Sequence, residues 1–136
     1  MALAMSMRLR NARLDTIETV LGASPIMRIF AGTMPVNCAG SDGANTVLAT
    51  VNLPADFMGP AASAQKSMLG TWTDISCDAS GTISYWRIFD NGGINCDLQG
   101  SAGLAGSGAD MITDAAAVTA GQYFTVVTFV LAEANQ

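Results

Sequence analysis

The chain has 136 residues, a length that fits one domain and is sufficient for a buried core. Half of its residues are hydrophobic and only 12% are charged, which excludes a disordered chain and favours a subunit that buries part of its exterior in an assembly; the alternative is a compact monomer rich in alanine and glycine. The net charge of −5 and the lack of a basic cluster argue against nucleic-acid binding.

The charge is unevenly distributed along the chain. Residues 1–30 hold four arginines against two acids, a net charge of +2, whereas residues 31–136 hold two basic residues against nine acids, a net charge of −7. A basic arm on an acidic body suits head-to-tail contact with a neighbouring subunit, and chance placement of a few arginines is the alternative. No segment reaches the roughly 20 apolar residues of a membrane span, and the arginines follow the apolar start, so we expect neither a membrane helix nor a signal peptide.

The first predicted element is a helix over residues 11–21, with a start as early as Ser6. Its apolar residues recur at spacings of three and four, which is typical of a helix with one buried stripe. Gly22 suits the position after the last helical turn, and Pro25 prevents continuation. The stripe is narrow, so we expect the helix to lie on a sheet or on a partner.

From Pro25 onward the hydrophobic period changes to two, which predicts strands. We expect strands over residues 26–31 and 46–53, one or two short strands within 67–76, and a last strand over 122–131. In the second of these strands one face is predicted to carry Val47, Ala49, Val51 and Leu53.

The intervening segments 32–45 and 54–65 are rich in turn-forming residues and are predicted to be long surface loops. One helix followed by seven or eight short strands predicts an all-β fold with an N-terminal helix, an antiparallel β-sandwich resembling a jelly roll. We divide the chain into an N-terminal arm and helix (residues 1–24) and a single β-sandwich domain (residues 25–136).

Residues 82–90 and 94–101 are predicted to form a hairpin around an Asn-Gly-Gly turn. A two-residue turn would place Arg87 opposite Cys96, whereas a three-residue loop with a left-handed glycine places Arg87 opposite Asp97. We prefer the second register because it pairs opposite charges on an exposed face, where the pair is worth at most about 1 kcal/mol. It places four side chains in the core: Trp86, Ile88, Cys96 and Leu98.

The side chains available for chemistry are few. The chain contains no histidine, the commonest general base and transition-metal ligand. Its cysteines lack the CxxC spacing of zinc sites, and the glycine-rich run 100–108 is followed by an acid where a phosphate-binding loop needs a lysine. We therefore expect no enzyme, no cofactor and no metal.

The segment 81–111 and the last strand carry a dispersed pattern of aromatic residues and glycines. It comprises Tyr85, Trp86, Arg87, Asp90, Gly92, Gly93, Gly100-Ser101-Ala102-Gly103, Gly108-Ala109-Asp110-Met111 and Ala120-Gly121-Gln122. Over residues 27–131 the chain thereby resembles the head decoration, or cement, proteins of tailed bacteriophages. The resemblance implies a virion structural protein that is made in the host cytoplasm and binds the capsid exterior as a homotrimer. The implied partners are the major capsid protein and further copies of the chain, with neither nucleic acid nor membrane, and many modest contacts act together to hold adjacent capsomers.

On this resemblance we expect capsid contact at the N-terminal arm, through Met5, Arg8 and Arg10, or at the loop that carries Cys38. The cysteines and the methionine-rich start depart from the family pattern. Other virion roles remain as alternatives, such as a tail or neck component or a receptor-binding protein. A carbohydrate-active enzyme on a β-sandwich is a further alternative, and it would need two carboxylates beside an aromatic groove.

The three cysteines Cys38, Cys77 and Cys96 are candidates for disulfide cross-links. Cys96 is predicted to be a buried thiol, whereas Cys38 and Cys77 lie in turn-rich segments where thiols are accessible. A virion persists in oxidising surroundings, and an odd number of cysteines leaves room for bonds between chains. We expect one or more of them to link neighbouring subunits or the shell; the alternative is that all three stay reduced.

Overall fold

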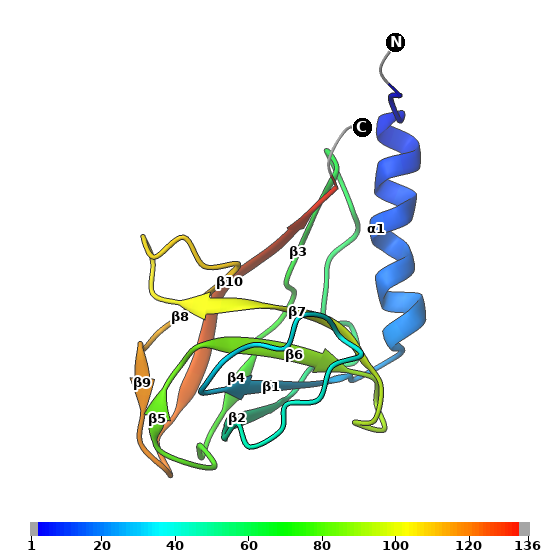
Figure 1. Cartoon of the computed structure of the whole chain (residues 1–136). Helices are drawn as coiled ribbons and strands as arrows, with labels where there is room; N and C mark the ends of the chain where they lie inside the picture. The colour runs from blue at the N-terminus through cyan, green and yellow to red at the C-terminus, as the bar shows by residue number, and fades with distance from the viewer. Residues whose placement is uncertain (1–2, 134–136) are drawn as a thin grey trace.

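The computed structural model describes residues 3–133, in which one helix, α1 (Met7–Leu21), precedes ten short strands (Figure 1). The all-β fold with an N-terminal helix is therefore confirmed. The strands are β1 (Ile26–Phe30), β2 (Val47–Asn52), β3 (Gln65–Ser67), β4 (Thr73–Asp74), β5 (Gly81–Thr82), β6 (Tyr85–Phe89), β7 (Cys96–Gly103), β8 (Met111–Thr113), β9 (Ala117–Val118) and β10 (Phe124–Ala132).

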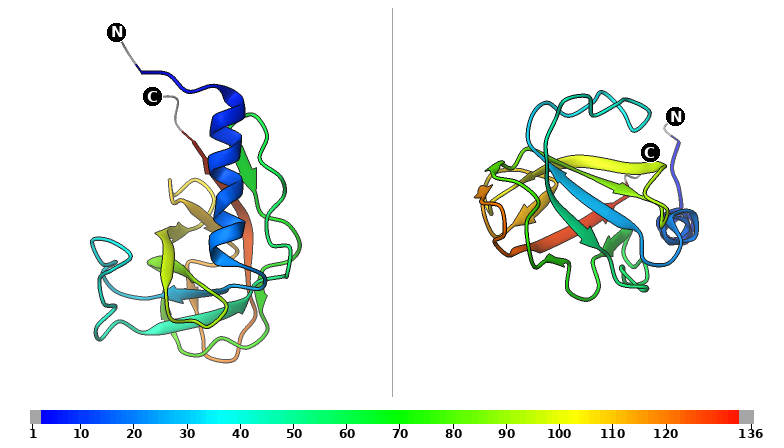
Figure 2. Two further views of the ribbon diagram at one scale, coloured as in Figure 1. Left: turned by 90° about the vertical axis from the view of Figure 1, so that its right-hand side faces the viewer. Right: turned by 90° about the horizontal axis from the view of Figure 1, so that it is seen from below.

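The main sheet runs in the order β2-β1-β6-β7-β8-β10-β3, with β4 also paired to β10, and β5 and β9 form a separate pair. It curls into a half-barrel, compatible with a sandwich or jelly-roll architecture (Figures 1 and 2). The sheet is mixed, because β7 and β8 pair in parallel where Ala102 lies beside Met111. The antiparallel expectation therefore holds for every strand pair of the described residues except this one.

Helix α1 begins and ends at capping residues that the sequence provides, Ser6 and Gly22. The Ser6 hydroxyl accepts a hydrogen bond from the Leu9 N–H at 3.1 Å, so the earlier of the two predicted starts is correct. Gly22 adopts a φ of 76° and donates its N–H to the Glu18 carbonyl at 2.9 Å, which ends the helix. The helix stands along one side of the half-barrel and contacts β3 (Figures 1 and 2).

The core lies inside the curl of the sheet and is centred on aromatic side chains. The rings of Trp86 and Phe129 meet edge to face with centroids 5.0 Å apart, and Trp72 lies 5.6 Å from Phe129. Strand β2 buries Ala49 and Val51, two members of its predicted inward face, but it also buries Leu48 on the other face.

The hairpin formed by β6 and β7 has neither of the two predicted registers. Arg87 pairs with Gln99 rather than with Asp97. The register shifts after Ile88, so that Phe89 pairs with Cys96. The turn is wider than three residues because the Asp90 carboxylate accepts hydrogen bonds from the N–H groups that follow it, at 3.1 and 3.3 Å. Trp86 and Ile88 are buried as predicted, whereas the irregularity moves Cys96 to the face opposite the core, so its predicted place was wrong.

Candidate functional site

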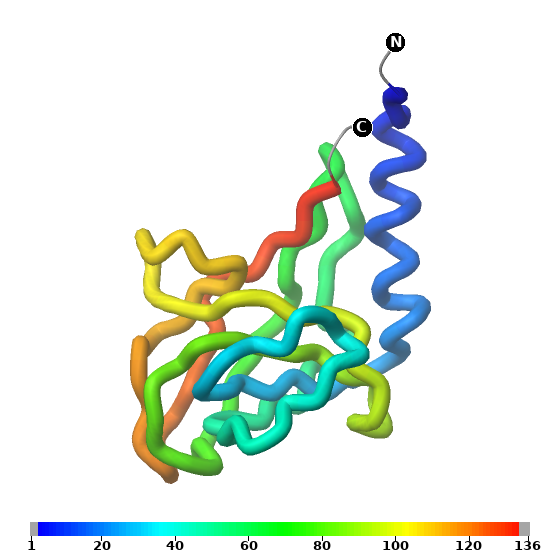
Figure 3. The backbone as a smooth tube through the Cα atoms, in the orientation of Figure 1, coloured from blue at the N-terminus to red at the C-terminus, as the bar shows by residue number. Residues whose placement is uncertain are grey.

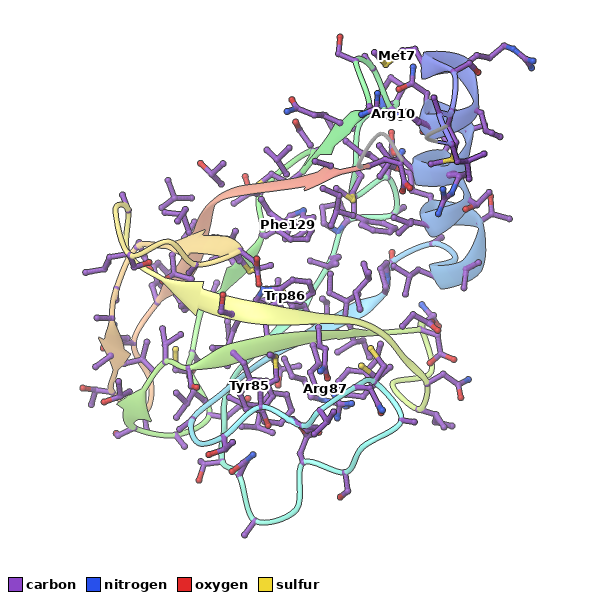
Figure 4. All side chains as sticks on the ribbon, turned by 45° about the horizontal axis from the view of Figure 1, so that its top comes forward. Met7, Arg10, Tyr85, Trp86, Arg87 and Phe129 are labelled. Carbon is purple, nitrogen blue, oxygen red and sulfur yellow. The ribbon has the colours of Figure 1, made fainter. Side chains whose placement is uncertain are left out.

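The side of β1, β6 and β7 that faces away from the core is covered by residues 32–45, which we call the capping loop (Figure 3). All five residues of β6 are buried. Successive residues of a strand point to opposite faces of the sheet, so both faces of the sheet are covered at β6. Tyr85 and Arg87 point toward the capping loop, and Trp86 points toward Phe129 in the core (Figure 4). We call the covered surface around Tyr85, Arg87 and Cys96 the capped face.

Arg87 occupies the centre of the capped face with 2% of its surface exposed. Its Nη1 donates to an Asp42 carboxylate oxygen at 2.8 Å, and its Nη2 donates to the Cys38 carbonyl at 2.7 Å. Burial is the largest single effect and disfavours the charged guanidinium, but the interactions with Asp42 and Cys96 together outweigh it, and the pKa of Arg87 is raised. The Nε group is buried without a hydrogen-bond partner.

Tyr85 ties a second point of the capping loop to the sheet. Its hydroxyl donates to the other Asp42 oxygen at 2.7 Å and accepts from the Asn45 side chain at 3.0 Å, while its ring stacks on Phe30 at 4.7 Å. Burial and the Asp42 hydrogen bond raise the pKa of Tyr85 to about 12. A third tie joins the Gln99 side chain to the Pro35 carbonyl at 2.8 Å. The loop is therefore held in one conformation by neutral and charged hydrogen bonds.

The predicted exposed pair of Arg87 and Asp97 was wrong. Arg87 is buried and bound to Asp42, and Asp97 lies exposed on the hairpin. Sequence reasoning missed Asp42 because it lies 45 residues before Arg87, in a segment that shows only turn-forming composition. The signal available was the lone arginine in an otherwise apolar and aromatic strand, which needs an acid somewhere to be buried.

The capped face also brings two of the three cysteines together. Cys38 lies on the loop and Cys96 on β7, and their thiols are close enough to interact electrostatically. The Cys96 thiol donates to the Leu98 carbonyl at 3.4 Å. Burial, and next the contact with Cys38, raise the pKa of Cys96. Cys77 lies elsewhere and is 3% exposed, so its predicted accessibility was wrong. Burial raises the pKa of Cys77 as well, and all three thiols are unpaired in the structure.

The N-terminal arm is fastened to the end of β10. Arg10 donates two hydrogen bonds to the Glu133 carbonyl, one of them at 3.1 Å, and Arg13 forms an ion pair with the Glu133 carboxylate at 2.9 Å. Met5 accepts a hydrogen bond from Arg13 at 3.0 Å. Of the three candidate capsid contacts, Arg8 is exposed, whereas Met5 and Arg10 are half-buried against their own chain (Figure 4 labels Arg10).

A buried lysine that sequence reasoning overlooked joins the other half of α1 to β3. Lys66 is 1% exposed, and its Nζ lies 2.7 Å from Asp15, 3.4 Å from Glu18 and 2.9 Å from the Gly59 carbonyl. The hydrogen bond from Lys66, with a further one from the Ala61 N–H, holds the pKa of Asp15 below its usual value. This cluster ties the C-terminal half of α1 to β3.

Within residues 3–133, no group of three His, Cys, Asp or Glu side chains is placed to hold a metal ion, and no helix is long and apolar enough to cross a membrane. Comparison of the chain with protein-family models, curated proteins and solved structures finds no match.

Proposed function

We propose that the chain is a virion structural protein of a tailed bacteriophage, a decoration protein that binds the outside of the head as a homotrimer and stabilises it. The proposal starts from the sequence resemblance over residues 27–131. The observation that carries it further is that both segments expected to contact the capsid expose apolar side chains while being fastened to the body. An exposed apolar group on a fixed segment binds a partner without the entropy loss of ordering that segment.

The capping loop offers the clearer of these two surfaces. Val36 is 99% exposed and Met34 is also exposed, although the loop beneath them is anchored through Asp42, Asn45 and Pro35. Buried hydrogen bonds to the capped face thus support an apolar outer surface, an arrangement suited to contact with another protein.

The N-terminal end of α1 offers the second surface. Leu3, Met7 and Leu9 are exposed there, beside the exposed Arg8. The pairing of Arg10 and Arg13 with Glu133 holds this end against β10. The capping loop and the start of α1 lie at separate places on the molecule (Figure 2), so one subunit is able to touch two neighbours at once, and such linked contacts multiply in affinity.

The test begins with purified particles of the phage that encodes the chain. Gel electrophoresis in SDS should recover this protein at a copy number comparable to that of the major capsid protein. Recovery at a few copies per particle would replace the proposal with a tail or neck role, and absence from particles would refute a structural role in the virion. Sedimentation of the purified protein should give the mass of three chains, and a monomer at all concentrations would refute the homotrimer.

A matched pair of substitutions tests the capping-loop surface. Heads that lack the protein are mixed with purified variants, and the bound fraction is measured after sedimentation. Val36→Asp should weaken binding at least tenfold, because it places a charge in an apolar contact, equivalent to about 1.4 kcal/mol. Ile75→Asp makes the same change at another exposed apolar residue, outside both surfaces, and should bind like the unaltered protein. Equal binding by both variants would exclude the loop as the contact.

A further inference from the structure

The two cysteines of the capped face are held close by more than their own contact. Cys38 belongs to the capping loop, and its carbonyl accepts a hydrogen bond from Arg87 Nη2 at 2.7 Å. The same guanidinium lies 5.7 Å from the ring of Phe89, the residue that pairs with Cys96, and it interacts electrostatically with Cys96. One side chain therefore lies beside both residues, and the two thiols are close enough to interact electrostatically.

The surroundings restrain both partners of this contact. Cys96 lies in the ladder between β6 and β7, opposite Phe89, and its thiol faces the loop rather than the core. Cys38 follows Asn37, whose side-chain oxygen accepts the N–H groups of Ala39 and Gly40 at 3.0 and 3.1 Å and fixes the local turn. Two neighbouring cysteines on restrained backbones need little movement to reach disulfide geometry.

We propose that Cys38 and Cys96 form an intrachain disulfide in oxidising surroundings, and that this bond fastens the capping loop covalently to β7. The proposal does not depend on the virion role, because it concerns a contact within one chain. It replaces the cross-link between subunits, since it uses two of the three thiols and the third, Cys77, is buried.

The oxidant is a low-molecular-weight disulfide, and the exchange proceeds in two displacements. The Cys38 thiolate attacks one sulfur of the reagent, so that a mixed disulfide forms and the first thiol leaves. The Cys96 thiol then loses its proton to solvent and attacks the Cys38 sulfur, which forms the protein disulfide and releases the second thiol. The protein loses two protons and two electrons, and the reagent is reduced to two thiols.

Cys38 is assigned as the first nucleophile because the thiolate of its partner is disfavoured. Burial and the neighbouring thiol raise the pKa of Cys96, which makes it the slower, resolving partner. The second displacement should therefore accelerate as the pH rises, since deprotonation of Cys96 limits it.

The positions of the basic residues make the test unambiguous. Trypsin, which cleaves after lysine and arginine, separates the cysteines into three peptides, 29–66, 67–87 and 88–136. The folded full-length protein is treated with oxidised glutathione, remaining thiols are alkylated, and the digest is analysed by mass spectrometry without reduction. We expect peptide 29–66 to be joined to 88–136, with the mass loss of two hydrogen atoms, while 67–87 is recovered alkylated.

Three controls accompany this digest. Cys77→Ser should leave the linkage intact, whereas Cys38→Ser should abolish it. Protein oxidised in urea should instead favour the pair nearest in sequence, Cys77 and Cys96, because a shorter loop closes with less loss of entropy. Recovery of 29–66 and 88–136 as separate alkylated peptides from the folded protein would overturn the proposal, as would a linkage found only in a dimer band of a non-reducing gel.

Discussion

Arg87 places a buried positive charge at the centre of the capped face. Removing a guanidinium from water is unfavourable by several kcal/mol unless its charge and its N–H groups are matched. Asp42 supplies the charge, and the carbonyls of the capping loop supply further acceptors. The sheet therefore depends on the loop to keep Arg87 buried, and the loop depends on Arg87 for its shape.

Tyr85 beside it gives a prediction about alkaline stability. Its pKa of about 12 exceeds the value near 10 expected in the unfolded chain, so the folded state retains a proton that the unfolded state has lost between these values. The contribution of Tyr85 to the free energy of unfolding is thus fully present below pH 10 and declines as the pH rises toward 12. Urea unfolding measured across this range should show the decline.

Tyr85→Phe should remove that part of the alkaline decline, and it should lower the stability at neutral pH by about 1 kcal/mol through the lost hydrogen bonds. Tyr123→Phe is the matched control, because Tyr123 is exposed. A decline of the same steepness in the Tyr85 variant and in the control would show that Tyr85 does not cause it.

At the scale of elements, the attachment of α1 to β3 depends on Lys66. Replacing Asp15 by alanine leaves a buried ammonium with one fewer acid. Replacing Lys66 by methionine keeps the buried hydrocarbon, and it leaves Asp15 with a side chain that is already half exposed to water. Asp15→Ala should therefore lower the free energy of unfolding by about 1–2 kcal/mol, and Lys66→Met should lower it by less. Thermal and urea unfolding of the two variants measure the difference.

The pH dependence supplies an independent check on the same cluster. Folding lowers the pKa of Asp15 from its unfolded value of 3.8. The contribution of Asp15 to the free energy of unfolding is therefore present above pH 3.8, and it is lost as the pH falls through the lower pKa of the folded state. The Asp15→Ala variant should lose less stability than the unaltered protein on acidification below pH 4. An equal loss in both proteins would contradict the role assigned to Asp15.

Local periodicity in the sequence was sufficient to predict α1, β1, β2 and β10, since each contains a helical or alternating apolar pattern of its own. It was insufficient for the β6–β7 register, because the Asp90 carboxylate widened the turn and no periodic signal reports that. The parallel contact of β8 with β7 was missed too, since it lies at the end of a glycine-rich run. The capped face brings residues 37–45 against residues 85–99. Local periodicity does not predict which segments pair when they lie so far apart in the sequence.

For the molecule as a whole, α1 and the sheet share one core. Leu21 of α1 packs in the same cluster as Trp72 and Trp86, although the sequence suggested an arm that is distinct from the body. We therefore expect one cooperative unfolding transition. Circular dichroism, which reports the helix, and tryptophan fluorescence, which reports the core, should give coincident urea midpoints. Earlier loss of the helical signal would show that α1 is an independently unfolding arm.

The position of β10 in this fold has a consequence for synthesis on the ribosome. β10 pairs with β3, β4 and β8 and carries Phe129 into the space between the two tryptophans, yet it is translated after all of them. Until it emerges, those strand edges and the indole rings lack their partners, and unpaired edges promote aggregation. The half-barrel of a nascent chain closes only once residues 124–132 have left the exit tunnel.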